Sequence, residues 1–185
     1  VETVQQNNVL SISENGNLYS IGVELNKNYT FENYSIGNSN KLAYSVAKSV
    51  ASGDEKFNSM FIYGSVGLGK THLLHSMAWE FKKNKPNSQI VYLSAERFMY
   101  LFVQALQTQD ISVFKEKFRS IDVLLIDDIQ FISGKEGTQK EFFHTFNTLM
   151  DDNKKVILAC DRAPLNLENV DEKLKSRMSG GIVID

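Results

Sequence analysis

The 185-residue sequence contains the stretch Gly64-Ser65-Val66-Gly67-Leu68-Gly69-Lys70-Thr71, set between an apolar run at 60–63 and a segment of helical period at 72–83. It matches the phosphate-binding pattern G-x-x-x-x-G-K-[ST] in the strand, loop and helix context that this pattern requires. Glycines let the backbone N–H groups point inward at a polyphosphate, and the following helix adds the positive end of its dipole. The pattern predicts that Lys70 reaches the β- and γ-phosphates and that Thr71 binds Mg²⁺. The alternative, a glycine-rich turn before an ordinary helix, is less favoured because the whole motif is present in context.

Four further short apolar runs follow the loop. They lie at residues 90–93, 123–126, 156–159 and 182–184, and segments of helical pattern separate them. Short apolar runs between helices are typical of a parallel sheet that is covered on both faces. Together with the run at 60–63, they predict a doubly wound α/β fold with a five-stranded parallel sheet.

Several helix starts can be read from the sequence. Residues suited to N-caps precede three of the helical patterns: Asn38 or Ser39, Ser94, and Asp110. Thr138-Gln139-Lys140-Glu141 has a capping-box pattern, which predicts that a helix begins just before Phe142. Phe142, Phe143 and Phe146 are expected to form the packed face of that helix.

Composition divides the chain into two parts. Residues 1–27 are rich in Asn, Gln, Ser and Glu and are predicted to be a flexible linker or tail, whereas residues 28–185 form the α/β core. A hydrophobic content of 42% is enough for one well-buried domain. The net charge of −2 argues against a globally basic nucleic-acid binder, so any DNA contact is expected to be local. The single cysteine, Cys160, fits a reducing cytoplasm and is expected to be a core residue.

A nucleotide site also needs a carboxylate that holds Mg²⁺, and parallel sheets place ligand groups at the carboxyl ends of their strands. The run at 123–126 ends in Asp127-Asp128. Asp127 is the candidate for the Mg²⁺ shell beside Thr71, and Asp128 for orienting or deprotonating the attacking water. The alternative is an acidic turn after a core strand, which the phosphate-binding loop makes less favoured.

Two further groups of polar residues stand at the ends of predicted elements. Asp161 follows the run at 156–159 and either contacts the γ-phosphate or starts a loop. Lys173, Lys175 and Arg177 stand near a helix end, where cations compensate the helix dipole on a solvated face.

The three histidines give no metal site by this reasoning. His72 and His75 are three residues apart on a helix, but no cysteine or carboxylate lies at ligand spacing, so zinc is not expected. His144 lies among aromatic residues and is expected in the core or at an interface.

Two runs are more discriminating than the loop: Asp127-Asp128-Ile129-Gln130-Phe131 and Glu141-Phe142-Phe143-His144-Thr145-Phe146-Asn147. With the segments at 29–34, 37–40, 64–75, 91–98 and 174–177, they resemble the AAA+ ATPase core of the DnaA family of bacterial chromosomal replication initiators. The resemblance covers about residues 28–185. It implies an AAA+ P-loop fold and a slow ATPase that uses ATP, ADP and Mg²⁺ as a switch.

The resemblance also implies roles in the nucleotide site and at a subunit interface. Asp161 matches the sensor-1 position, which reads the γ-phosphate, and residues 36–38 match the segment that contacts adenine and ribose. Arg177 matches the arginine finger that touches ATP on a neighbouring subunit. A finger supplied in trans makes the contact head-to-tail, and such contacts yield rings or open filaments.

A DNA surface is implied in the same way. Val103, in the helix pair over 95–118, and Lys135 match positions associated with single-stranded DNA. Family members assemble in an ATP-dependent filament on the replication origin and help to open the duplex. The implied partners are origin DNA, further copies of the chain, the replicative helicase or its loader, and acidic phospholipids, in a bacterial cytoplasm close to the nucleoid.

The sequence departs from the family pattern at five positions: Gly137 replaces Arg or Gln, Leu165 replaces Lys, Lys173 replaces Arg, and Met178 and Gly180 replace Phe and Trp. These changes predict an altered DNA contact and looser packing around the finger. Family members continue into a helical lid and a helix-turn-helix domain, so we expect this chain to be a truncated piece without the lid. Two alternatives are a related AAA+ regulator or helicase loader, and a nucleotide-dependent scaffold with little turnover.

Overall fold

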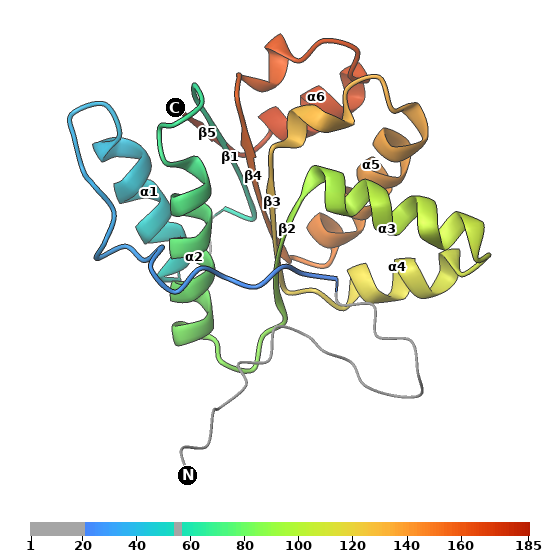
Figure 1. The fold of residues 1–185 in the computed structure, drawn as a ribbon, viewed down its shortest axis with the longest axis horizontal. Coiled ribbons are helices and arrows are strands. Elements are labelled where there is room, and N and C mark those ends of the chain that lie inside the picture. The colour runs from blue at the N-terminus through green and yellow to red at the C-terminus, as the bar shows by residue number, and fades with distance from the viewer. Residues whose placement is uncertain (1–20, 54–56) are drawn as a thin grey trace.

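The computed structural model describes residues 21–53 and 57–185. In these residues five strands alternate with helices (Figure 1). The strands are β1 (Ser59–Tyr63), β2 (Ile90–Ser94), β3 (Val123–Asp127), β4 (Lys155–Cys160) and β5 (Ile182–Ile184). The α-helices are α1 (Lys41–Ala51), α2 (Lys70–Asn84), α3 (Ala95–Gln107), α4 (Ile111–Arg119), α5 (Glu136–Asp151) and α6 (Glu172–Ser179). Two short 3₁₀ helices, η1 (Ile129–Ile132) and η2 (Pro164–Asn166), follow β3 and β4.

The strands form one parallel sheet in the order β2-β3-β4-β1-β5, which confirms the predicted five-stranded parallel sheet. Chain order and spatial order differ, because β4 lies between β1 and β3. The register pairs Ser94 with Asp127 and Tyr63 with Cys160. The carboxyl ends of four neighbouring strands therefore meet at one edge of the sheet, where open α/β sheets bind ligands.

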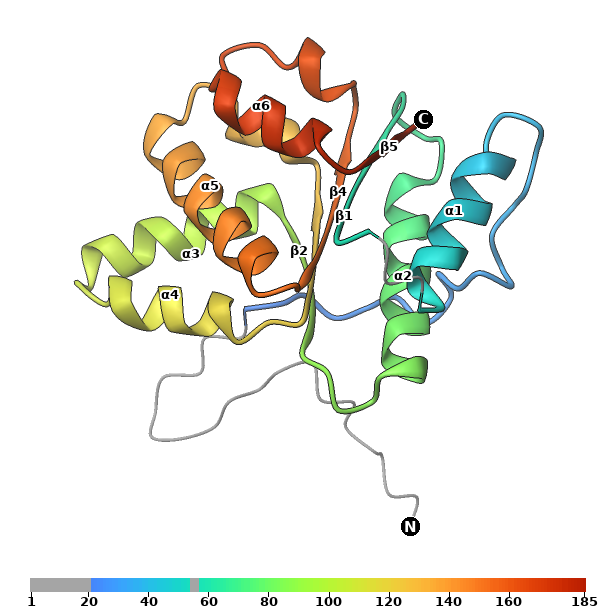
Figure 2. The ribbon, with the colours of Figure 1, turned by 180° about the vertical axis from the view of Figure 1, so that it is seen from behind.

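Helices cover both faces of the sheet, as Figures 1 and 2 show from opposite sides. Alternate strand residues point to opposite faces. On one face the buried residues Met60, Ile62, Leu125 and Ile157 pack with α1 and α2. On the other face Phe61, Leu124, Ile126 and Leu158 pack with α3, α4, α5 and α6. Burial on both faces explains why the strands read as continuous apolar runs.

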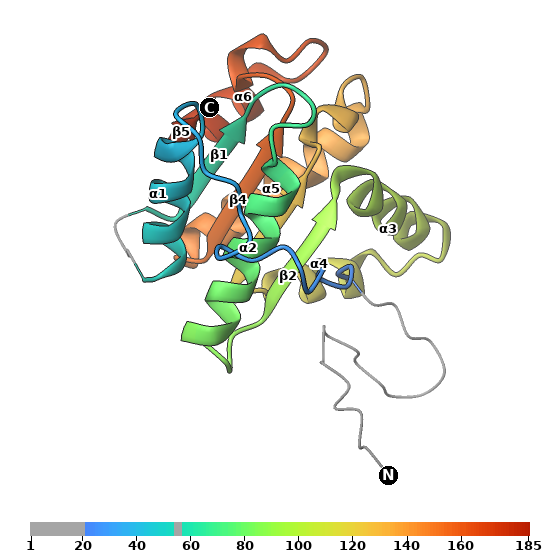
Figure 3. The same ribbon diagram turned by 60° about the vertical axis from the view of Figure 1, so that its left-hand side comes forward.

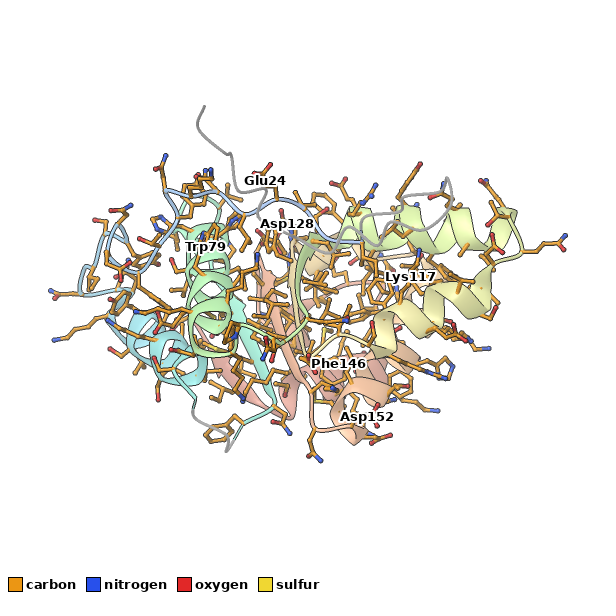
Figure 4. The ribbon with its side chains drawn as sticks, turned by 90° about the horizontal axis from the view of Figure 1, so that it is seen from below. Glu24, Trp79, Lys117, Asp128, Phe146 and Asp152 are labelled. Carbon is orange, nitrogen blue, oxygen red and sulfur yellow. The ribbon has the colours of Figure 1, made fainter. Side chains whose placement is uncertain are left out.

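Aromatic side chains dominate the second layer. Phe98 of α3 contacts Phe114 and Phe118 of α4 and Phe142 of α5 edge to face, with ring centroids 5.1–5.6 Å apart. Such pairs add about 0.5–1.5 kcal/mol each beyond their buried area. Phe142 and Phe146 are buried and Phe143 packs beside them, which confirms the predicted helix face. Figure 4 shows Phe146 among the interior side chains and Asp152 at the periphery.

Of the four predicted helix starts, those at Ser94 and Asp110 are confirmed and two are wrong. Asp110 is the N-cap residue of α4, although its side chain makes no capping hydrogen bond. The Ser94 hydroxyl accepts a hydrogen bond from the Arg97 N–H and caps α3. α1 is preceded by Asn40, not by Asn38 or Ser39, because the Asn40 amide is held by the Gly37 N–H and the Ser35 carbonyl. The capping-box prediction at Thr138 is wrong as well. α5 begins two residues earlier, at Glu136, and Thr138 is buried within the helix.

Part of the predicted tail packs against the core. Residues 21–27 run past β2 and α2 (Figure 3), and the Val23 N–H donates to the Tyr92 carbonyl on the edge strand β2. Ile21 and Leu25 are buried, and the Trp79 indole donates to the Asn26 carbonyl. A flexible tail is therefore the wrong description of residues 21–27, while residues 1–20 of that prediction lie outside the described residues.

Among the described residues, no helix combines the length and the apolar character that a membrane crossing requires.

Candidate nucleotide-binding site

The loop between β1 and α2 has the backbone conformation that its glycines predict. Gly67 and Gly69 have φ of +87° and +85°, in the left-handed region that favours glycine. A Cβ at Gly69 would also lie 3.2 Å from Cε2 of Tyr34, which is a tight contact that would require the Tyr34 ring to shift. The ammonium of Lys70 donates to the carbonyls of Gly64 at 2.7 Å and Ser65 at 2.9 Å, so it lies within the loop.

Asp127 is brought to the loop from the end of β3. Its carboxylate is 3% exposed, and its Oδ2 accepts hydrogen bonds from the Thr71 hydroxyl at 2.5 Å and the Tyr92 hydroxyl at 3.2 Å. Burial raises the pKa of Asp127 above its ordinary value, and the hydrogen bond from Thr71 opposes this shift. The structure thus joins the two residues that the sequence assigned to the Mg²⁺ shell.

This pair fits Mg²⁺ by the chemistry of its donors. Mg²⁺ prefers oxygen ligands and is usually held by one or two carboxylates together with substrate phosphates. A buried carboxylate such as Asp127 needs a compensating positive charge, because burial penalises its ionised form. A divalent cation bound beside Thr71 would provide that charge.

Asp128 occupies a sharp turn directly after β3. Its φ of +54° lies in the left-handed region, which Asp adopts more readily than most residues, and its N–H donates to Oδ1 of Asp127 at 2.9 Å. The turn directs the two acidic residues differently. The Asp127 side chain meets Thr71, whereas Oδ1 of Asp128 accepts a hydrogen bond from Gln130 at 2.9 Å.

Asp161 follows β4, the strand between β1 and β3. Its carboxylate forms a two-point ion pair with Arg162, with both N···O distances 2.8 Å, and this pair lowers the pKa of Asp161. The backbone N–H of Asp161 donates to Oε1 of Gln130 at 3.3 Å. Asp161 is thereby connected to Asp128 through one glutamine side chain.

Gln130 is the residue that sequence reasoning missed. The sequence indicated only that it belongs to a discriminating run, and gave no reason to place it in the site. Its position depends on η1, which turns the chain back so that residue 130 lies between the ends of β3 and β4.

The candidates for the arginine finger and the DNA contact lie on elements of the opposite face of the sheet from α2, whereas residues 36–38 precede α1 on the same side as α2. Arg177 is exposed on α6, Val103 is 42% exposed on α3, and Lys135 is exposed at the N-cap of α5. Their roles stay predictions. Met178, which follows Arg177 in the chain and is one of the departures from the family pattern, is buried and packs in the hydrophobic core.

Two of the histidines hold the segment that precedes α1 against α2. Nε2 of His72 lies 2.9 Å from the Thr30 carbonyl, and Nδ1 of His75 accepts a hydrogen bond from the Asn26 N–H at 3.0 Å. His144 is exposed on α5, so a place in the core is the wrong reading for it.

Comparison with known proteins agrees with this geometry. A family model described as bacterial DnaA ATPase domain matches residues 25–185. The chromosomal replication initiator protein DnaA of Rickettsia canadensis is 51% identical over 172 residues, which are 91% of this chain and 37% of the relative. The chain thus spans about a third of the length of that curated relative.

Solved structures give the same assignment. Domain III of the Thermotoga maritima replication initiation protein DnaA superimposes with a TM-score of 0.85 and 42% identity, covering 88% of this chain and 68% of that one. A replication initiator DnaA bound to AMPPCP and single-stranded DNA has a TM-score of 0.82 and 46% identity, covering 86% of this chain and 50% of that one. With its phosphate-binding loop, its acidic pair after β3 and this similarity over most of its length, the chain belongs to the bacterial DnaA ATPase domain family.

Proposed function

We propose that this domain is the ATP-binding motor core of a chromosomal replication initiator, in which ATP or ADP with Mg²⁺ sets a slow switch. The observation that carries the proposal is the 2.5 Å contact between Thr71 and Asp127, beside a loop that encloses the Lys70 ammonium. These groups come from three elements and meet at one edge of the sheet. The relative bound to AMPPCP supports a nucleotide as the ligand.

Each of these residues has a distinct part in binding. The loop residues Gly64, Gly67, Leu68 and Gly69 present backbone N–H groups to phosphate oxygens. Lys70 exchanges its two carbonyl contacts for the β- and γ-phosphates, and Thr71 and Asp127 hold Mg²⁺. The bound ion neutralises charge on the phosphates.

Two further residues act on the reacting end of the nucleotide. Asp128 orients or deprotonates the attacking water, and Asp161 senses the γ-phosphate. Arg162 keeps the Asp161 carboxylate ionised, since the two-point ion pair lowers the pKa of Asp161. An ionised carboxylate can accept hydrogen bonds but cannot donate them, so Asp161 senses the γ-phosphate through an intervening donor such as the attacking water.

In the proposed function, Arg177 links ATP binding to the assembly of several copies of the chain. Its exposed guanidinium contacts ATP on a neighbouring copy, so that ATP favours a head-to-tail filament. ATP shifts the chain toward the assembling state by no more than its differential affinity for that state. Hydrolysis then resets the switch.

In the whole protein this filament works on the replication origin in the bacterial cytoplasm. Val103 and Lys135 face single-stranded DNA, and the relative bound to single-stranded DNA supports this ligand. Duplex origin DNA, the replicative helicase or its loader, and acidic phospholipids are further partners. A helicase loader and an inert scaffold are the alternative functions, and the 51% identity to an initiator favours the motor core.

The proposal is tested by calorimetric titration of the chain with ATP and with ADP in the presence of Mg²⁺. Lys70→Ala should abolish binding, because it removes the ammonium that meets the phosphates. Lys140→Ala, which removes an exposed lysine on α5, is the matched control and should bind as the parent does. Unchanged affinity in Lys70→Ala would refute the loop assignment. Phosphate release by the parent separates an ATPase from a scaffold.

A further inference from the structure

Gln130 contacts two of the residues to which we assign the chemical step. Its Nε2 donates to Oδ1 of Asp128 at 2.9 Å, and its Oε1 accepts from the Asp161 N–H at 3.3 Å. Asp128 follows β3 and Asp161 follows β4, and these strands are neighbours in the sheet. One side chain therefore spans the ends of two adjacent strands at the candidate site.

The chemistry of the two contacts requires an amide at residue 130. Oδ1 of Asp128 accepts its hydrogen bond, so its partner must donate, and the backbone N–H of Asp161 can only donate, so its partner must accept. The bridging group must donate at one end and accept at the other. The planar amide of glutamine does both, whereas glutamate lacks the donor and methionine lacks both functions.

The bridge completes a continuous series of contacts across the site. Thr71 donates to Asp127, whose Oδ1 accepts from the Asp128 N–H, and the Asp128 carboxylate accepts from Gln130. Gln130 in turn holds the backbone of Asp161. Neither of the two Gln130 contacts involves the phosphate-binding loop.

We propose that Gln130 is a positioning residue for ATP hydrolysis, an inference that rests on the function proposed above. It fixes the direction of the Asp128 carboxylate and ties it to Asp161, so that the residue acting on water and the residue sensing the γ-phosphate move together. Because its contacts lie beyond the loop, Gln130 governs turnover and leaves the ground-state affinity for ATP unchanged. A displacement of a catalytic group by about 1 Å can lower a rate about a hundredfold.

The test compares Gln130→Met and Gln130→Glu with the parent chain. Methionine has a similar length and makes neither hydrogen bond, whereas glutamate keeps the acceptor for Asp161 but places a second carboxylate against Asp128. We expect the Kd for ATP to change by no more than about twofold, and phosphate release to fall roughly ten- to a hundredfold in both variants. Turnover equal to that of the parent in Gln130→Met overturns the proposal.

Gln139 offers a matched control, because it is a bridging glutamine outside the candidate site. Its Nε2 donates to the carbonyls of Ile132 and Asn169, and its Oε1 accepts from the Asp171 N–H. Gln139→Met should lower the midpoint of thermal unfolding without changing turnover per folded molecule. A loss of turnover in Gln139→Met equal to that in Gln130→Met would make the Gln130 effect a general structural one and overturn the proposal.

A nucleotide-free measurement separates this inference from the proposed function. NMR of the chain should show that Gln130→Met speeds hydrogen exchange at the Asp161 amide and shifts the carboxyl ¹³C resonance of Asp128. If neither signal changes, the bridge is absent and the inference fails even when the parent hydrolyses ATP. A parent that binds ATP but releases no phosphate overturns the proposed ATPase, and with it the catalytic part of this inference.

Discussion

The stability of the domain should depend on pH through His75. This side chain is 5% exposed on α2, and burial lowers its pKa from 6.5 to about 4, with a smaller contribution from His72. Its Nδ1 accepts the Asn26 N–H, which requires that nitrogen to be unprotonated. The unfolded chain therefore binds a proton more readily than the folded chain between about pH 4 and pH 6.5. The His75 contribution is fully favourable above this window and is lost as the pH falls through it.

The size of the effect follows from the two pKa values. Protonation of His75 stabilises the unfolded chain more than the folded chain, because the unfolded pKa is the higher of the two. With pKa values of 6.5 and about 4, the resulting loss of unfolding free energy is small at pH 7 and amounts to about 2 kcal/mol at pH 5. We therefore expect His75 alone to lower the free energy of unfolding by about 2 kcal/mol between these two pH values.

Urea titrations at pH 7, 6 and 5 and constant ionic strength measure this dependence. His75→Gln should be less stable at pH 7, because it loses ring contacts with Tyr29 and Tyr92, but its stability should fall less between pH 7 and pH 5. His144→Gln removes an exposed histidine and should keep the parent profile. Parallel profiles for His75→Gln and the parent would refute the reasoning.

Three further predictions use other parts of the fold. Ser94→Ala should destabilise the domain by about 1 kcal/mol in urea titration, because it removes the cap on the Arg97 N–H, and an unchanged midpoint would contradict this. Gly181→Ala should cost about 2–3 kcal/mol, since its Cβ would meet Oγ and the backbone of Ser59. Gly180→Ala, with its nearest neighbour at 3.4 Å, is the control and should cost much less. Arg177→Ala should leave ATP affinity intact but reduce ATP-dependent assembly of the complete initiator in light scattering, with Lys173→Ala as control. Equal assembly by Arg177→Ala and its parent would exclude the finger role.

The sequence by itself determined the parts of this domain that depend on local pattern. The loop from Gly64 to Thr71 was readable because its chemistry needs fixed residues at fixed spacing, and the five strands because burial on both faces makes them continuously apolar. The acidic pair after β3 was predictable because parallel sheets place ligand groups at the carboxyl ends of their strands. Ser94 was predicted correctly as a cap because the N–H that donates to its hydroxyl, that of Arg97, lies within one helical turn.

Only the tertiary structure decided which distant residues meet. The strand order places β4 between β1 and β3, and the contact of Thr71 with Asp127 joins residues 56 positions apart. Gln130 gained its place because η1 turns it toward Asp161, and residues 21–27 joined the core through contacts with β2 and α2. Periodicity reports which face of an element is apolar, but the pairing of elements depends on packing summed over the whole core. The fold class could therefore be predicted from local sequence patterns. The hydrogen-bonded network of the site depends on long-range packing and could not.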